Sequence, residues 1–227
     1  MQLREIGDEI WVGDGDLSPM GTHFGTRMTV VRCPSGKLAV HSVVPAYPQM
    51  KAELSQLGGV GYFLAPNLFH HSFLSDALQM FPDARLYGVP GLAKKRKDLK
   101  FTGELTPDLP DELGSVFEAV AYGGTLMFNE LAMFHKKSKS LIVTDLVFNY
   151  GPTEHWWSRN YRKMFQVNKR LASSRLMRAM TKDPAALRVS VDEILKWDFE
   201  RVCLTHGEVA ENTGPDQFSE ALSWVQS

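Results

Sequence analysis

The fold of this chain is decided by the stretch Val60-Gly61-Tyr62-Phe63-Leu64-Ala65-Pro66-Asn67-Leu68-Phe69-His70-His71. Its apolar first part, residues 60–64, predicts a buried strand, and residues 72–78 predict the start of a helix. Two imidazoles at this strand-to-helix turn lie beyond the carboxyl end of a strand, where α/β proteins place their ligand-binding groups. Because histidine is the commonest metal-binding side chain, the pair indicates a candidate metal site.

The sequence on both sides of this stretch predicts alternating strands and helices. Before it, strands are expected at residues 9–12, 27–32 and 37–41, followed by a helix at 49–57. After it, further strands are expected at residues 85–89, 116–122, 130–134, 141–144 and 201–204, and helices at 90–99, 183–195 and 215–225. This order predicts two sheets packed together with helices outside, in a single domain over residues 1–227.

Composition limits the class of protein. The chain has 227 residues, of which 44% are hydrophobic and 22% charged, as is ordinary for a soluble globular protein. A net charge of −1 gives no overall attraction to nucleic acid or to an anionic membrane. The N-terminal residues contain no apolar signal region, and no apolar stretch reaches the ~18 residues that span a bilayer. We therefore expect a soluble cytoplasmic protein, with Cys33 and Cys203 as buried thiols.

Three predicted strand ends carry residues that bind metals or transfer protons. They are Pro66 to His71, Thr144-Asp145 and Thr205-His206-Gly207. A carboxylate or an imidazole that directly follows a buried strand is placed at the end of that strand by the fold. Each residue alone is also compatible with a structural role, as a hydrogen-bonded histidine or a turn aspartate. The three ends together predict that these side chains converge on one point.

These runs resemble the metallo-β-lactamase superfamily, and more closely a branch of it with a degenerate first metal motif. The resemblance implies an αββα four-layer sandwich, with two mixed sheets face to face and helices outside, for a fold of metal-dependent hydrolases and oxidoreductases. It covers nearly the whole chain and is carried by residues 27–31, 65–71, 141–149 and 205–207.

The first motif of that superfamily is His-x-His-x-Asp-His. With its final histidine on His71, the aspartate position becomes His70, and the two leading histidine positions become Pro66 and Leu68, which cannot bind a metal. The third histidine position of the family falls near Glu130.

The resemblance places the bridging aspartate on Asp145 and the last histidine on His206. It therefore implies that the first of the two family metal sites is lost, and that a single ion is held at the second site by His70, His71, Asp145 and His206. Imidazole and carboxylate ligands suit Zn²⁺ or Fe²⁺, with Mn²⁺ as a further candidate.

Four protein ligands on a tetrahedral ion make a closed site, whereas catalysis needs an open position. Either the ion takes five or six ligands, or one of the four residues does not bind it. In the second case His70, in place of a carboxylate, leaves the metal and acts as a general base with Asp145 on the metal. Glu130 or Asn67 would then support the ligands or transfer protons. His41, at the end of a predicted strand, either orients a ligand or is a hydrogen-bonded structural residue, and His23 is expected to line the cleft.

A basic segment lies between residues 159 and 182, and no acidic residue occurs in it. Its basic residues are Arg159, Arg162, Lys163, Lys169, Arg170, Arg175, Arg178 and Lys182. It is typical of a solvated helix face, but it is also compatible with recognition of an anionic substrate or of a nucleic-acid backbone.

Three functions follow as hypotheses. The first is a metal-dependent hydrolase of a small ester, lactone, thioester or phosphoester, acting on a small-molecule substrate with no membrane partner. The second is a non-catalytic descendant of the fold, with a closed or empty metal site and a binding or structural role. The third, a protein that binds nucleic acid through residues 159–182, is ranked last because the net charge is close to zero.

Overall fold

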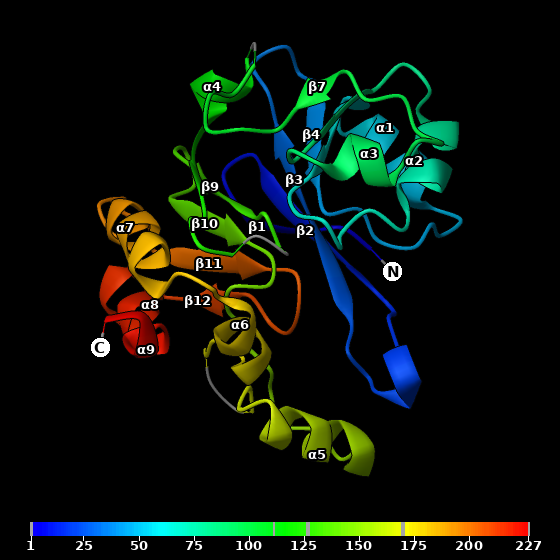
Figure 1. The fold of residues 1–227 in the computed structure, drawn as a ribbon. Coiled ribbons are helices and arrows are strands. Elements are labelled where there is room, and N and C mark those ends of the chain that lie inside the picture. The colour runs from blue at the N-terminus through cyan, green and yellow to red at the C-terminus, as the bar shows by residue number, and fades with distance from the viewer. Residues whose placement is uncertain (1, 111, 126–127, 169–170, 227) are drawn as a thin grey trace.

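The computed structural model describes residues 2–110, 112–125, 128–168 and 171–226. Two sheets face each other in its centre, and helices cover the outer face of each (Figure 1). This arrangement confirms the predicted sandwich of two mixed sheets with helices outside. In the part of the chain that is described, no helix combines the length and the apolar content needed to cross a bilayer.

The first sheet has seven strands in the order β1-β2-β3-β4-β5-β6-β7. Their bounds are Arg4–Gly7, Ile10–Gly15, Thr26–Arg32, Leu38–His41, Val60–Ala65, Arg85–Gly88 and Gly103–Glu104. The strands β1 to β4 pair antiparallel, whereas β4 to β7 pair parallel. The short 3-10 helix η1, Pro19–Gly21, lies in the long connection between β2 and β3. The outer helices of this half are α1 (Met50–Gln56), α2 (Leu74–Met80) and α3 (Leu92–Lys95).

The second sheet has five strands in the order β12-β11-β10-β9-β8. Their bounds, in chain order from β8, are Phe117–Ala121, Leu131–His135, Ser140–Val143, Arg201–Leu204 and Ala210–Glu211. Only β10 and β11 pair parallel, with Val143 opposite Leu204. The helices of this half are α4 (Leu113–Val116), α5 (Trp156–Met164), α6 (Arg175–Met180), α7 (Pro184–Ile194), α8 (Pro215–Ala221) and α9 (Ser223–Gln226).

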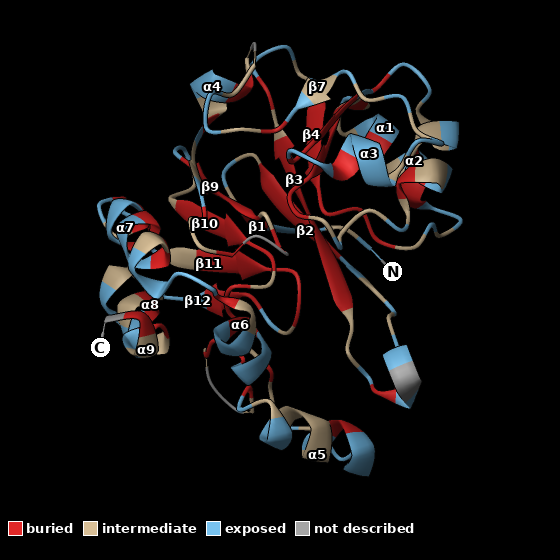
Figure 2. Cartoon of the chain, in the orientation of Figure 1, coloured by how far each residue is buried: buried red, intermediate tan, exposed pale blue. Residues whose placement is uncertain are grey.

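The side chains of β9 show how the second sheet divides the core. Leu131 and Met133 pack into the cluster between the two sheets, whereas Ala132 and Phe134 pack with the buried face of α7. Successive side chains of a strand point to opposite faces, so both faces of this sheet are apolar because both are covered. The central strands β9 and β10 are accordingly buried along their length, while the helices are buried on one side only (Figure 2).

Several predicted elements differ from the structure. The helix expected at 90–99 covers only Leu92–Lys95, because the chain leaves helical geometry at Arg96. The strand expected at 116–122 begins one residue later, after α4. The strands β1, β7 and β12 were not predicted, since β7 and β12 have two residues each and only Ile6 of β1 is buried. Cys33 and Cys203 are buried free thiols, as predicted.

Candidate metal centre

Three strand ends bring three chemically active side chains together. Asp145 and His206 follow the neighbouring parallel strands β10 and β11, so both lie at the same edge of the second sheet. His70 reaches this edge from the turn between β5 and α2 of the first sheet. Ligand atoms of His70, Asp145 and His206 all lie within 4.8 Å of one another. The predicted convergence of the three strand ends is therefore present.

His206 is oriented by a hydrogen bond to the backbone. Its Nδ1 donates to the carbonyl oxygen of Gly25 at 2.8 Å, so the proton of the neutral ring is on Nδ1. Its Nε2, which then has only a lone pair, faces Oδ1 of Asp145 at 3.4 Å. Burial lowers the pKa of His206, although Asp145 opposes that effect. A neutral ring therefore presents a lone pair to a carboxylate, and a cation between the two removes this repulsion.

His70 approaches the other oxygen of the same carboxylate. Its Nε2 lies 3.4 Å from Oδ2 of Asp145, and its Nδ1 lies 2.8 Å from the hydroxyl oxygen of Ser42. Burial lowers the pKa of His70, but the charge and the hydrogen bond of Asp145 outweigh it and raise the pKa above its ordinary value. The pKa of Asp145 is in turn held well below its usual range, because the two imidazoles outweigh the effect of burial.

The three residues fit a divalent ion in number and in spacing. The 3.4 Å separations exceed the ~2.8 Å of a charge-assisted hydrogen bond. Each separation involves a different oxygen of Asp145, and one ligand atom from each of the three residues lies within 4.8 Å of the others, close enough for all three to contact one ion. Three protein ligands leave one position of such an ion free, which is the arrangement of catalytic rather than structural zinc sites.

His71 is not one of these ligands, although it was predicted to be the more secure of the pair. Its Nδ1 lies 3.1 Å from Nη1 of Arg96, and the same guanidinium nitrogen donates to the His71 carbonyl oxygen at 2.6 Å. Burial and the charges of Lys95 and Arg96 lower the pKa of His71. The roles predicted for the two neighbours are thus exchanged: His70 faces Asp145, and Arg96 holds His71 away from it.

The exchange also moves the family motif by one residue. With the final histidine on His70, its second histidine position falls on Asn67 and its aspartate position on Phe69. Asn67 is fully buried, and its Nδ2 donates to Asp145 at 2.7 Å. Its Oδ1 accepts from the backbone nitrogens of Phe69 and His70, which fixes the orientation of the amide. Asn67 therefore supports the ligands, as predicted, by positioning both His70 and Asp145.

Glu130 is a positioning residue and does not line the cavity described below. Its Oε1 accepts from the backbone nitrogen of Thr144 and its Oε2 from that of Asp145, both at 2.9 Å. Asn67 Nδ2 lies 3.3 Å from the same Oε2. Burial, and then Asp145, raise the pKa of Glu130. The sequence predicted that Glu130 supports the ligands or transfers protons, and its contacts with the backbone at Asp145 favour the supporting role.

Two further predictions place histidines at the site. His41 is buried with no hydrogen-bond partner for its Nε2, and burial lowers its pKa to about 3. The next residue, Ser42, makes the contact with His70 instead. His23 lines a neighbouring hollow and stacks on His155 with ring centroids 4.1 Å apart. Apart from its position after a predicted strand, nothing in the sequence indicated that Ser42 contacts the site.

Arg27 fastens the loop of the last ligand to the first sheet. It is 6% exposed, and its Nη1 donates to the carbonyl oxygen of Gly207 at 2.6 Å while its Nη2 pairs with Asp14 at 2.6 Å. Gly207 directly follows His206. Together with the hydrogen bond to Gly25, this contact fixes the imidazole of His206 from the strand β3 side.

A cavity of about 440 Å³ opens over the three residues, within the roughly 300–1,000 Å³ of small-molecule sites. His70, Asp145 and His206 belong to its lining. The wall is otherwise mainly aromatic and aliphatic, from the β2–β3 connection, the β5–α2 turn, α5 and α6.

Comparison with known proteins places the chain in a family. Residues 7–154 match the family described as "Domain of unknown function (DUF4336)". The chain belongs to this family. No curated protein matches the DUF4336 chain.

Solved structures similar to the DUF4336 chain share its fold. A metallo-β-lactamase from Pontibacter korlensis has a TM-score of 0.67 at 12% identity, covering 100% of this chain and 99% of that one. The metallo-β-lactamase FIM-1 from Pseudomonas aeruginosa, in its mono-zinc form, has a TM-score of 0.67 at 10% identity, covering 99% and 94%. The metal-soaked Flv1 flavodiiron core from Synechocystis has a TM-score of 0.65 at 12% identity, covering 99% and 60%. The DUF4336 chain therefore has the metallo-β-lactamase fold, as the sequence resemblance implied.

Proposed function

We propose that the protein is a metal-dependent hydrolase that uses one divalent ion, Zn²⁺ or Fe²⁺ and alternatively Mn²⁺, at His70, Asp145 and His206. The observation that carries this proposal is the set of three converging ligands on the wall of a cavity. A bound ion would supply Lewis acidity and lower the pKa of water, which hydrolysis of an ester, lactone, thioester or phosphoester requires. Three ligands leave room for that chemistry, whereas the four predicted from the sequence do not.

The side chains contribute orientation and charge to this reaction. Gly25 fixes the tautomer of His206, and Ser42 contacts the far nitrogen of His70, as partners behind metal-binding histidines commonly do. Asn67 donates to Asp145, which stabilises the ionised carboxylate. For a carboxylic ester, the oxygen of one water forms a bond to the acyl carbon and the bond to the alkoxy oxygen breaks. One water proton passes to the departing alcohol, and the other is released as the acid product ionises.

The test combines metal content with turnover. Protein purified without chelator should contain close to one metal ion per chain, and added Zn²⁺, Fe²⁺ or Mn²⁺ should raise the melting temperature of the stripped protein. Esters should be hydrolysed in the presence of the ion, and turnover should disappear in Asp145→Ala. A metal content far below one ion per chain, together with no rise in melting temperature, would overturn the proposal.

A second candidate is a non-catalytic descendant of the fold. It is favoured by the buried Asn67 and Glu130, which lie at positions of the family motif that bind the first metal and are now joined to each other and to Asp145. One bound ion without hydrolysis of any ester, thioester or phosphoester would support this candidate over the enzyme.

A further inference from the structure

The wall of the cavity above the three ligands is apolar in a way that the proposed hydrolysis alone does not require. Seven of its lining residues are aromatic: Phe24, Phe69, Phe73, Phe128, Phe148, Tyr161 and Phe165. Among the described residues, no lysine and no arginine lines this cavity. Asp145 is the one carboxylate of the lining, and it lies among the ligands.

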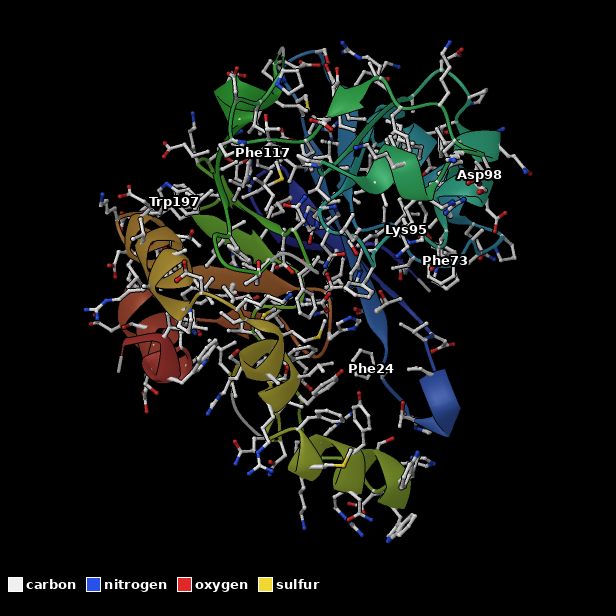
Figure 3. All side chains as sticks on the ribbon, in the orientation of Figure 1. Phe24, Phe73, Lys95, Asp98, Phe117 and Trp197 are labelled. Carbon is white, nitrogen blue, oxygen red and sulfur yellow. The ribbon has the colours of Figure 1, made fainter. Side chains whose placement is uncertain are left out.

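The aromatic side chains reach the ligands themselves. Phe24 belongs to the β2–β3 connection and lies on the side of it that faces α5 and α6 (Figure 3), with its ring centroid 4.4 Å from that of His206. Its ring is also 5.9 Å from that of Tyr161 on α5. Phe148 stacks on His206 with centroids 5.7 Å apart. A substrate group beside the ligands therefore contacts aromatic carbon, and no lysine or arginine of the described lining.

The basic side chains near the β5–α2 turn are already engaged. Lys95 donates to the carbonyl oxygen of Leu68 at 2.7 Å, and its Nζ lies 5.2 Å from the ring centroid of Phe69. Arg96 pairs with Asp98 at 2.6 Å and donates to the carbonyl oxygen of His71.

The described basic residues of segment 159–182 do not line the cavity either. Arg162 of α5 donates to the carbonyl oxygens of Gly151 and His23, and its guanidinium lies 4.1 Å from the ring centroid of Tyr150. Lys169 and Arg170 lie outside the described residues. Away from the three ligands, an anionic group in the cavity would thus leave water without a lysine or arginine partner from the described lining, at a cost that burial of charge makes large.

The rim of the cavity is left uncovered. Phe69 is 46% and Leu176 is 45% exposed, and both line the cavity. Large apolar side chains that stay exposed around a cavity mark a ligand site when they are contiguous. An apolar ligand that enters the cavity covers both.

We infer that the cavity is a subsite for an uncharged alkyl or aryl group, so that the substrate is a carboxylic ester, lactone or thioester with an apolar chain. This inference rests on the proposed hydrolase function for the bond that is broken. The subsite itself rests on the wall and is testable without turnover.

The first experiment measures binding without hydrolysis. Isothermal titration of the full-length protein loaded with Zn²⁺ compares N-octylacetamide, N-ethylacetamide and octyl phosphate. We expect N-octylacetamide to bind at least ten-fold more tightly than N-ethylacetamide, since each buried methylene contributes about four-fold. Octyl phosphate carries the same chain on a head group that the ion can bind, so it does not test the wall. Equal affinity of the two amides would overturn the subsite.

A matched pair of variants locates the binding. Leu176→Asp places a charge at the rim and should weaken binding of N-octylacetamide at least ten-fold, because the carboxylate must lose water when the chain enters. Val189→Asp, on α7 outside the cavity lining, has a comparable change at a residue 64% exposed and should leave the affinity unaltered. Equal affinities in both variants would contradict the assigned wall.

The second experiment separates this inference from the proposed function. Turnover of p-nitrophenyl acetate, butyrate and octanoate is compared with that of p-nitrophenyl phosphate. A rise of kcat/KM with chain length and no phosphate hydrolysis supports both. Hydrolysis with no dependence on chain length overturns the subsite alone, whereas selective binding of the octyl amide with no hydrolysis of any ester overturns the hydrolase alone.

Discussion

Two groups of buried polar side chains meet at Asp145 and differ in how their atoms are satisfied. In the closed group, which we define as Asn67, Glu130 and Thr144, each named contact pairs a donor with an acceptor. In the open group, which we define as His70, Asp145 and His206, the imidazole Nε2 of His206 faces a carboxylate oxygen. A buried polar cluster in which each acceptor has a donor is therefore stable by itself, whereas a cluster in which lone pairs face each other is stabilised by a cation.

The largest effect is expected on metal content, when His70 and His71 are each replaced by alanine. His70→Ala should reduce bound metal from about one ion per chain to below about one tenth, because it removes one of three ligands. His71→Ala should keep the ion, because the His71 ring contacts Arg96 and not Asp145. Elemental analysis of both variants, with circular dichroism to verify folding, measures this difference. Loss of metal in His71→Ala to the same degree would return His71 to the ligand set.

The next effect concerns the closed group. Glu130→Ala should lower the free energy of unfolding by about 3 kcal/mol or more, because the backbone nitrogens of Thr144 and Asp145 lose their buried acceptor. Urea unfolding of the metal-free protein measures the change. Glu118→Ala, which removes an exposed acceptor of Trp197 Nε1, serves as the control and should cost about 1 kcal/mol. Equal costs in the two variants would show that the closed group is not held by these bonds.

A smaller effect is expected behind the open group. Ser42→Ala removes the partner of His70 Nδ1 and should weaken metal affinity by about ten-fold to 100-fold, as losses of such outer partners do. Competition with a chromophoric chelator measures the dissociation constant. Ser72→Ala, which also lies in the cavity lining, should leave it unchanged. An unaltered affinity in Ser42→Ala would mean that the ion does not depend on the orientation of His70.

The smallest effect is expected on the pH dependence of stability, when the buried imidazole of His41 is replaced. The Nε2 of His41 has no hydrogen-bond partner among the described residues, and the pKa of this side chain is lowered to about 3 from the ordinary 6.5, first by burial and then by His70. Between these values the unfolded chain binds a proton that the folded chain does not, so stability falls as the pH falls, by about 1.4 kcal/mol per pH unit. His41→Gln should reduce this slope by that amount in chelator-treated protein, as measured by urea unfolding between pH 6 and pH 4. Identical slopes would show that His41 titrates normally.

The sequence predicted the architecture because its long strands carry a clear apolar pattern. Residues 60–64 and 141–144 were placed to within a residue or two of β5 and β10. The strands β7 and β12 could not be predicted, since two residues carry no period and their pairing depends on neighbours distant in sequence.

The convergence of three strand ends was predictable from the sequence, whereas the choice between His70 and His71 was not. Asp145 and His206 follow strands directly, so the fold alone directs them to the edge of the second sheet. His70 and His71 lie in a turn, where side chains do not alternate between two faces as they do in a strand. The sequence therefore does not indicate which of the two points inward. The choice is made by Asn67, which binds the His70 backbone, and by Arg96, which holds His71 from 25 positions further along the chain.

The hydrogen bonds that hold His206 have a consequence for when the proposed metal site can form. The hydrogen bonds from His206 to Gly25 and from Arg27 to Gly207 join positions 181 and 180 residues apart in the chain. Contacts of such separation form late, because closing a long loop costs entropy before the contact repays it. His206 therefore joins the other two residues of the proposed metal site only when the C-terminal part of the chain has folded against the first sheet.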